Sequence, residues 1–160
     1  MHTNTTGFVE YKSSPHPQNG AIGAAAVNSG TAEWKVRVRV NTGGFAADVF
    51  VGVAKAGRTV HTMCPSAYGE NFYDNECSDY SGFWCTGFID HALSGTWTRY
   101  RNLPHCNDGD VVTVRVDFGA GTLTYMLNSV LIKTLPMGVT GMALSLVASV
   151  KGLGQSVNVV

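Results

Sequence analysis

The sequence lacks an excess of charge of either sign. Eleven lysines and arginines balance eleven aspartates and glutamates, and charged residues make up only 14% of the 160 residues. Without a net positive field, the chain has no long-range attraction for nucleic-acid phosphates or anionic lipid headgroups. We therefore expect neither nucleic acid nor a membrane as a partner.

Long apolar runs are also missing. The first residues, MHTNTTGFVEYKSS, contain neither a basic leader nor an apolar stretch of signal-peptide length, and no later run reaches the length of a membrane span. The four cysteines, at 64, 77, 85 and 106, are not needed as disulfide staples in a domain of this size. These features favour a cytoplasmic or nuclear protein, and they leave the redox state of the cysteines open.

Helical periodicity is absent as well. Nowhere does an apolar residue recur at helical spacing over three turns, so helices longer than a turn or two are not expected. The sequence instead alternates apolar and polar residues with the two-residue period of a half-buried strand. In EWKVRVRVN, residues 33–41, the side chains of Trp34, Val36, Val38 and Val40 face one way and charged side chains face the other.

The clearest series of strands and turns is GDVVTVRVDFGAGTLTYMLNSVLIK, residues 109–133. Alternation predicts one strand over 112–118 and another over 123–127, separated by a short glycine-containing loop. Asn128-Ser129 is predicted to form a two-residue turn into a third, apolar strand.

Further strands are predicted within 48–54, 142–150 and 156–160. Many short strands joined by glycine-rich turns are typical of two packed antiparallel sheets. We therefore predict an all-β fold, a two-sheet antiparallel β-sandwich with long connecting loops. The length favours a single domain over residues 1–160, in which 1–29 is an N-terminal extension or a strap across the sandwich.

Residues 109–133 resemble the characteristic pattern of SPRY (B30.2-like) domains, in which Gly-Asp precedes an apolar strand and Asn-Gly ends the hairpin that follows. The matching positions are Gly109-Asp110, Asp117, Gly121-Thr122-Leu123, Tyr125 and Asn128. Ser129 stands where the family usually has glycine.

Other segments carry the same resemblance in the same order. AEWKVRVRV is similar to the family's Trp-Glu-Val strand, VFVGVA to its Ile-Gly-Val-Ala strand, and GLGQSVNVV to its closing Gly-Gln-Ser strand. The resemblance covers residues 34–160. It implies a bent sandwich of concanavalin-like topology and a domain that recognises a protein or peptide without catalysis.

Aromatic residues are concentrated in one part of the chain. Nine of the sixteen lie between Tyr68 and Tyr100, and no lysine or arginine occurs between Arg58 and Arg99, although five acidic residues do. Aromatic side chains on loops bury large areas with few rotatable bonds, so binding surfaces favour them. We predict an aromatic and acidic surface on loops at one end of the sandwich, chiefly 60–84, that takes a basic or mixed peptide. The candidate partner-binding residues are Arg58, Tyr68, Tyr73, Tyr80, Trp84, Arg99, Tyr100 and Arg101.

The alternative is that part of these aromatics, Trp97 and Phe88 first, fill the ends of the core.

Residues with catalytic or metal-binding potential are present, but their spacing matches no known centre. His61 and Cys64 have the two-residue gap of a zinc knuckle, yet no Cys-x-x-Cys pair completes it. The acidic residues between 70 and 79 lack the spacing of a calcium loop, and no Gly-x-Ser-x-Gly elbow occurs. Asp90 and His91 would point to opposite faces of a strand. We therefore expect no enzyme, no catalytic residues, no metal and no cofactor.

Three kinds of function remain open at this point. The leading one is a non-catalytic protein–protein interaction module that binds a peptide or protein through loops, as a substrate-recognition or scaffold subunit. A glycan-binding lectin-like domain and a structural subunit of a larger assembly are the alternatives. The sequence does not identify the partner or the oligomeric state.

Overall fold

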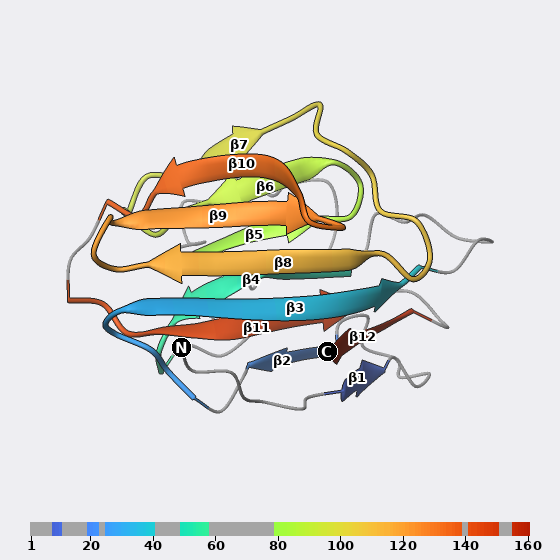
Figure 1. The fold of residues 1–160 in the computed structure, drawn as a ribbon, viewed down its shortest axis with the longest axis horizontal. Coiled ribbons are helices and arrows are strands. Elements are labelled where there is room, and N and C mark those ends of the chain that lie inside the picture. The colour runs from blue at the N-terminus through green and yellow to red at the C-terminus, as the bar shows by residue number, and fades with distance from the viewer. Residues whose placement is uncertain are drawn as a thin grey trace.

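The structure is a computed structural model that describes residues 8–10, 19–22, 25–40, 49–57, 79–138, 141–150 and 155–160. Within these ranges the regular elements are all strands, which pair antiparallel in two six-stranded sheets (Figure 1). This confirms the predicted all-β sandwich. The described part of the chain also holds no helix with the length and hydropathy needed to cross a bilayer.

The two sheets lie face to face and are here called the front sheet and the back sheet (Figure 1). The front sheet contains, in spatial order, β1 (Phe8–Glu10), β12 (Ser156–Val159), β3 (Thr31–Arg39), β8 (Val111–Asp117), β9 (Thr122–Leu127) and β10 (Val130–Pro136). The back sheet contains, in the same way, β2 (Asn19–Ile22), β11 (Leu144–Val150), β4 (Val49–Lys55), β5 (Tyr80–Trp84), β6 (Phe88–His91) and β7 (Thr98–Tyr100).

The strands of the front sheet follow the predicted alternation. In β3, Trp34, Val36 and Val38 are buried, whereas the lysine and arginines between and after them are exposed. β8 lies beside β3 with Val114 directly opposite Trp34, and Val114 is fully buried. One face of these strands therefore packs on the back sheet, and the other faces solvent.

The turn between β9 and β10 has the predicted two residues. Asn128 and Ser129 have φ angles of 50° and 68°, the positive values that a primed hairpin turn requires. The Asn128 side chain accepts a hydrogen bond from the Val111 N–H at 2.9 Å and donates one to Asp110 Oδ1 at 2.8 Å. Serine thus occupies the left-handed position where the SPRY pattern usually has glycine.

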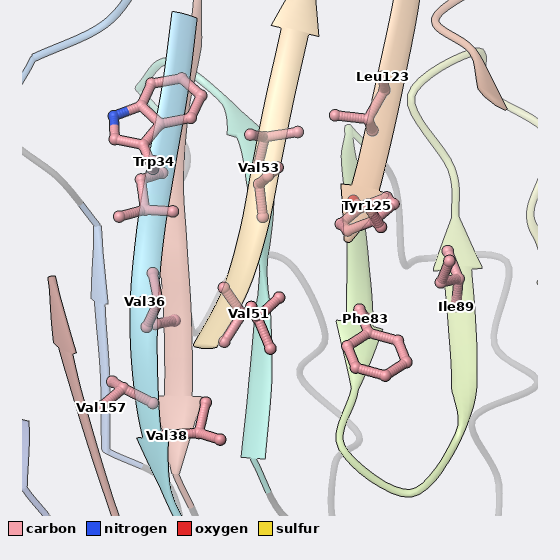
Figure 2. Close-up of a cluster of buried hydrophobic side chains, with 14 of the residues drawn as sticks. Trp34, Val36, Val38, Val51, Val53, Phe83, Ile89, Leu123, Tyr125 and Val157 are labelled. Atoms are coloured by element: carbon pink, nitrogen blue, oxygen red, sulfur yellow. The ribbon is translucent and has the colours of Figure 1, made fainter. Parts of the chain in front are cut away.

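The core fills the space between the sheets (Figure 2). Tyr125 of β9 is fully buried and reaches across to the back sheet, where its hydroxyl donates a hydrogen bond to Ser81 Oγ at 3.0 Å. The largest buried apolar side chains of this core include Trp34, Phe83, Ile89, Leu93, Leu123, Tyr125 and Leu144.

The back sheet is buried on its outer face as well. In β4 the first six residues are all buried, so side chains on both faces of this strand are covered. A second hydrophobic cluster lies on the outer face and contains Phe50, Ala54, Tyr80, Ala92 and Val147, with Trp84 and Trp97 packed against it. We call this group the outer-face cluster.

The N-terminal strands lie at the sheet edges. β1 pairs with β12 at one edge of the front sheet, and β2 pairs with β11 at one edge of the back sheet. Residues 8–10 and 19–22, which precede β3 in the chain, therefore add one edge strand to each sheet.

Candidate interaction surface

The structure describes five of the eight candidate partner-binding residues. Arg58, Tyr68 and Tyr73 lie outside the described residues, as do most of 60–84. Tyr80 and Trp84 form the two ends of β5, a strand of the back sheet whose first four residues are buried. The prediction that 60–84 forms a loop surface at one end is therefore wrong for 80–84, because these residues pair with β4 and β6.

Tyr80 belongs to the outer-face cluster and does not offer a contact surface. Its side chain is 3% exposed, and its ring lies 6.0 Å from the ring of Phe50. Burial, and then the negative charge of Asp90, raise the pKa of Tyr80, so the phenol stays neutral. The assignment of Tyr80 to partner binding is corrected, because a side chain this deeply buried packs the fold.

The Asp90 carboxylate binds two half-buried side chains next to the outer-face cluster, Arg99 and Trp84. Its carboxylate is fully buried and accepts hydrogen bonds from Arg99 Nε at 2.7 Å and Arg99 Nη2 at 2.8 Å. The Trp84 Nε1–H donates to the same carboxylate at 3.0 Å. Since β6 pairs with β7 in a register that sets Asp90 opposite Arg99, the bidentate ion pair follows from the sheet itself.

Aromatic rings stack on one another and on the guanidinium of the Asp90–Arg99 ion pair. The rings of Trp84 and Phe88 are stacked at 5.6 Å, and the Arg99 guanidinium lies 4.3 Å from the centre of the Phe88 ring. The ring of Trp97 lies 5.2 Å from the same guanidinium. These four residues, Trp84, Phe88, Arg99 and Trp97, form a row of half-buried planar groups, which we call the stacked row.

Tyr100 and Arg101 continue the chain beyond the row. Tyr100 is half-buried and packs against the core between the sheets, with Lys133 Nζ of β10 at 4.6 Å from its ring centre. Arg101 is exposed. The edge strands β7 and β10 thus meet through Tyr100 and Lys133, and Arg101 stands next to this contact.

Of the five acidic residues that predict an acidic surface, the structure describes two, Asp79, which is half-buried, and Asp90. Asp90, one of the five acidic residues in that stretch, is buried and paired with Arg99, so it contributes no exposed negative charge. Arg101 and Lys133 supply positive charge at the adjoining edge. Glu70, Asp74 and Glu76 lie outside the described residues, so the acidic surface stays a prediction for them.

A second polar network lies inside the core. Ser81 Oγ is hydrogen-bonded to His91 Nδ1 at 3.0 Å and accepts from the Tyr125 hydroxyl. The His91 ring also bonds to the backbone of Pro136, while burial lowers the pKa of His91 and keeps the ring neutral. Ser81 is fully buried between the sheets, so a substrate cannot reach this serine–histidine pair in the folded domain. We assign the network to the core.

Asp90 and His91 do point to opposite faces of β6, as the strand period predicts. Asp90 binds Trp84 and Arg99 of the stacked row, and His91 belongs to the polar network inside the core. In the described part of the chain, no three His, Cys, Asp or Glu side chains are grouped as metal ligands would be. His61, Cys64 and Cys77 lie outside it.

Known structures share this architecture. The SPRY domain of human HERC1 superposes with a TM-score of 0.66 over 90% of this chain and 82% of that one, at 17% sequence identity. The chain has the SPRY fold. The PSpry domain of TRIM65 matches with a TM-score of 0.59 and 16% sequence identity, over 88% of this chain and 68% of that one. A further human SPRY domain matches with a TM-score of 0.58 and 12% sequence identity, over 95% of this chain and 89% of that one. No protein-family model and no curated protein matches the sequence.

The resemblance seen in the sequence is thus confirmed at the level of the fold. The residues that carry it are structural: Asp110 and Asn128 hydrogen-bond to each other, and Asp117 Oδ1 accepts from the Ala120 N–H at 2.8 Å to close the preceding turn. These contacts fix two consecutive hairpins of the SPRY fold. Residues 109–133 thus form the strands and turns that these contacts hold together.

Sequence reasoning missed that Phe88 and Trp97 belong to the stacked row and that Asp90 holds its Trp84 and Arg99 in place. Phe88 and Trp97 were assigned to the ends of the core only as an alternative, yet both lie beside Arg99 on the outer face of the SPRY sandwich. The usable pattern was the spacing of Trp84, Phe88 and Asp90. Two strands joined by a tight turn bring these three to one face.

Proposed function

We propose that this chain is a non-catalytic interaction module that binds a peptide or protein partner, and that the stacked row with Arg101 beside it forms part of the contact surface. In this role it acts as a substrate-recognition or scaffold subunit. The SPRY fold supports this kind of module, and the observation that carries the proposal is the row of planar side chains around the Asp90–Arg99 ion pair.

The chemistry of the row suits partner binding. Tryptophan, tyrosine and arginine are the residue types that carry most of the binding energy in protein interfaces. The Trp84 indole and the Arg99 guanidinium are both held by the buried Asp90 carboxylate, so little side-chain entropy is left to lose when a partner packs on them. The row combines half-buried aromatic rings with an arginine, and interface cores are enriched in both residue types.

The test is affinity capture from a native cell extract with the tagged full chain and two pairs of matched variants. Phe88→Leu removes the flat ring at the centre of the row and keeps an apolar side chain, whereas Phe118→Leu makes the same change at a half-buried phenylalanine of the front sheet. Arg101→Glu reverses an exposed charge beside the row, and Arg115→Glu does so on the exposed face of β8.

We expect a partner that wild type, Phe118→Leu and Arg115→Glu recover and that Phe88→Leu and Arg101→Glu lose, with all four variants folded by circular dichroism. Equal recovery by all four would place the contact surface elsewhere. Recovery of glycans that free sugar releases would replace the proposal with a lectin.

Arg58, Tyr68 and Tyr73 remain part of the proposal as loop contacts. A Tyr68→Ala/Tyr73→Ala double variant tests them in the same capture experiment. A loss of partner in this variant but not in Phe88→Leu would move the contact surface from the row to the loop.

A further inference from the structure

Two free cysteines face each other where β5 and β8 approach the same end of the sandwich. Cys85 follows β5 directly, and Cys106 lies in the segment before β8. The Cys106 backbone N–H donates to the Cys85 carbonyl at 2.9 Å, so the two residues lie side by side. Cys85 is fully buried and Cys106 is 4% exposed, and both belong to the core between the sheets.

The backbone N–H···O bond places the two main chains next to each other. Hydrogen-bonded neighbouring strands are about 5 Å apart. Disulfides span Cα separations of about 4.4 to 6.8 Å, with the sulfurs brought together by side-chain rotation. Because the two backbones are hydrogen-bonded and both side chains belong to the same core cluster, rotation about the Cα–Cβ bonds is the main change needed.

We propose that Cys85 and Cys106 are a disulfide-forming site that a low-molecular-weight disulfide oxidises. The cross-link joins the turn after β5 to the segment before β8. The inference does not depend on the proposed interaction function.

The reaction is two thiol–disulfide exchanges. The Cys106 thiolate attacks one sulfur of the reagent RS–SR, so that a Cys106–S–S–R bond forms, the reagent's S–S bond breaks and RS⁻ leaves as RSH after taking up a proton. Cys85 then attacks the Cys106 sulfur, forms the Cys85–Cys106 bond and releases the second RS⁻, which takes up the proton that Cys85 lost. The two cysteines lose two electrons and two protons, and the reagent is reduced to two RSH.

The surroundings of the two cysteines explain why Cys106 reacts with the reagent first and Cys85 second. Cys106 sits in a non-strand segment whose neighbours Pro104, His105 and Asn107 are exposed, so a local opening of this segment brings its thiol to solvent. Cys85 follows β5, and burial raises the pKa of its thiol, which makes it unreactive toward reagents in bulk solvent. Once Cys106 carries the reagent, Cys85 is its nearest thiol among the described residues.

Oxidation should stabilise the fold and tie together two surface segments. The turn after β5 adjoins Trp84, and the segment that ends at Cys106 begins at Arg101. A disulfide that closes a loop of about 20 residues restricts the unfolded chain more than the folded one.

The test treats the folded full chain with oxidised glutathione and reads the product by intact mass and by peptide mapping without reduction. A Cys64→Ser/Cys77→Ser variant keeps only the proposed pair, and a further Cys106→Ser change serves as the matched control. We expect a loss of about 2 Da, a linked peptide pair containing Cys85 and Cys106, and a Tm raised by about 5 °C or more.

Two outcomes would overturn the proposed disulfide site, and a third would overturn the stabilisation expected from it. Two thiols that still titrate after oxidation and denaturation would show that the pair does not close. A mass gain of one glutathione would show that Cys85 fails to displace it. A cross-link accompanied by a lower Tm would show that the bond distorts the core instead of stabilising it.

Discussion

The two sheets of this sandwich use their outer faces differently. On the front sheet the outer face carries exposed lysine and arginine side chains between buried valines, as in β3. On the back sheet the outer face carries the outer-face cluster and a fully buried carboxylate, Asp90. The front sheet is therefore stabilised from one side and the back sheet from both.

This difference separates scaffold from candidate surface. A solvated face of charged side chains tolerates change, because each side chain contacts mainly water. A face on which rings stack around a buried ion pair holds its side chains in one geometry, and rigid side chains are the ones that bind with small entropic cost. The comparison predicts that equivalent substitutions have large effects on the back sheet's outer face and small effects on the front sheet's.

The largest effect is expected inside the sandwich, where both sheets are buried. Val114→Asp places an unpaired carboxylate in the fully buried core and should cost more than about 4 kcal/mol, enough to unfold the domain. Arg115→Asp, the next residue on the exposed face of β8, should change the free energy of unfolding by less than about 0.5 kcal/mol. Urea denaturation measures both, and equal losses would mean that the front sheet is buried on both faces too.

The ion pair on the outer face of the back sheet comes next. Arg99→Ala leaves the Asp90 carboxylate buried without its cation and with the Trp84 N–H as a hydrogen-bond donor, and should destabilise the domain by about 3 to 5 kcal/mol. Lys35→Ala removes the exposed pair with Glu33, whose atoms are 3.6 Å apart, and should cost about 0 to 1 kcal/mol. Similar losses for the two variants in the same denaturation assay would contradict the burial of Asp90.

Close packing in the outer-face cluster gives a third, smaller effect. A Cβ at Gly82 would lie 2.0 Å from the Phe50 ring, so Gly82→Ala should cost about 1 to 3 kcal/mol through overpacking. Gly119→Ala in the front-sheet hairpin is the control, because its nearest contact, Asp117 Oδ1, lies at an ordinary 3.4 Å. A Phe50→Leu change should recover part of the loss at Gly82, and a failure to do so would place the strain in the backbone.

The sequence predicted the front sheet well for a physical reason. Alternation in β3 and β8 reports directly which side faces water, and the hairpin turns carry the glycine and asparagine that their φ angles need. In the back sheet the sequence predicted the strands β4 and β11, but it did not show that their outer face is covered, because a strand buried on both faces, as β4 is, reads as a largely apolar run.

The prediction of the candidate binding residues was also wrong in the back sheet. Tyr80 and Trp84 belong to one short strand, but sequence alone did not show that this stretch pairs with β4 and β6. The Asp90–Arg99 ion pair depends on the register of β6 against β7, which no local pattern determines. Residue types pointed to an aromatic surface, and only the strand pairing showed which of its members are buried.

His91, on the inner face of β6, should make the stability of the domain depend on pH. Burial lowers the pKa of His91 in the folded domain below its unfolded value of about 6.5, so the unfolded chain binds this proton more readily. Stability from this residue is full above about pH 6.5 and falls as the pH drops toward the folded pKa. His91→Gln should flatten this part of the profile in denaturation measured between about pH 7 and pH 5. An unchanged slope would assign the dependence to other groups.

The smallest effect concerns the turn at the tip of the front sheet. Ser129 holds a φ of 68°, which strains any residue with a Cβ, so Ser129→Gly should raise the free energy of unfolding by about 0.5 to 1 kcal/mol. Ala120→Gly in the preceding turn, where φ is not positive, should lower it by a similar amount because glycine only adds freedom to the unfolded chain. Thermal denaturation separates the two signs. Because Val130 and Leu131 beyond the turn are 69% and 62% exposed, little packing at this tip offsets the strain, and a destabilising Ser129→Gly would mean that the serine side chain itself holds the turn.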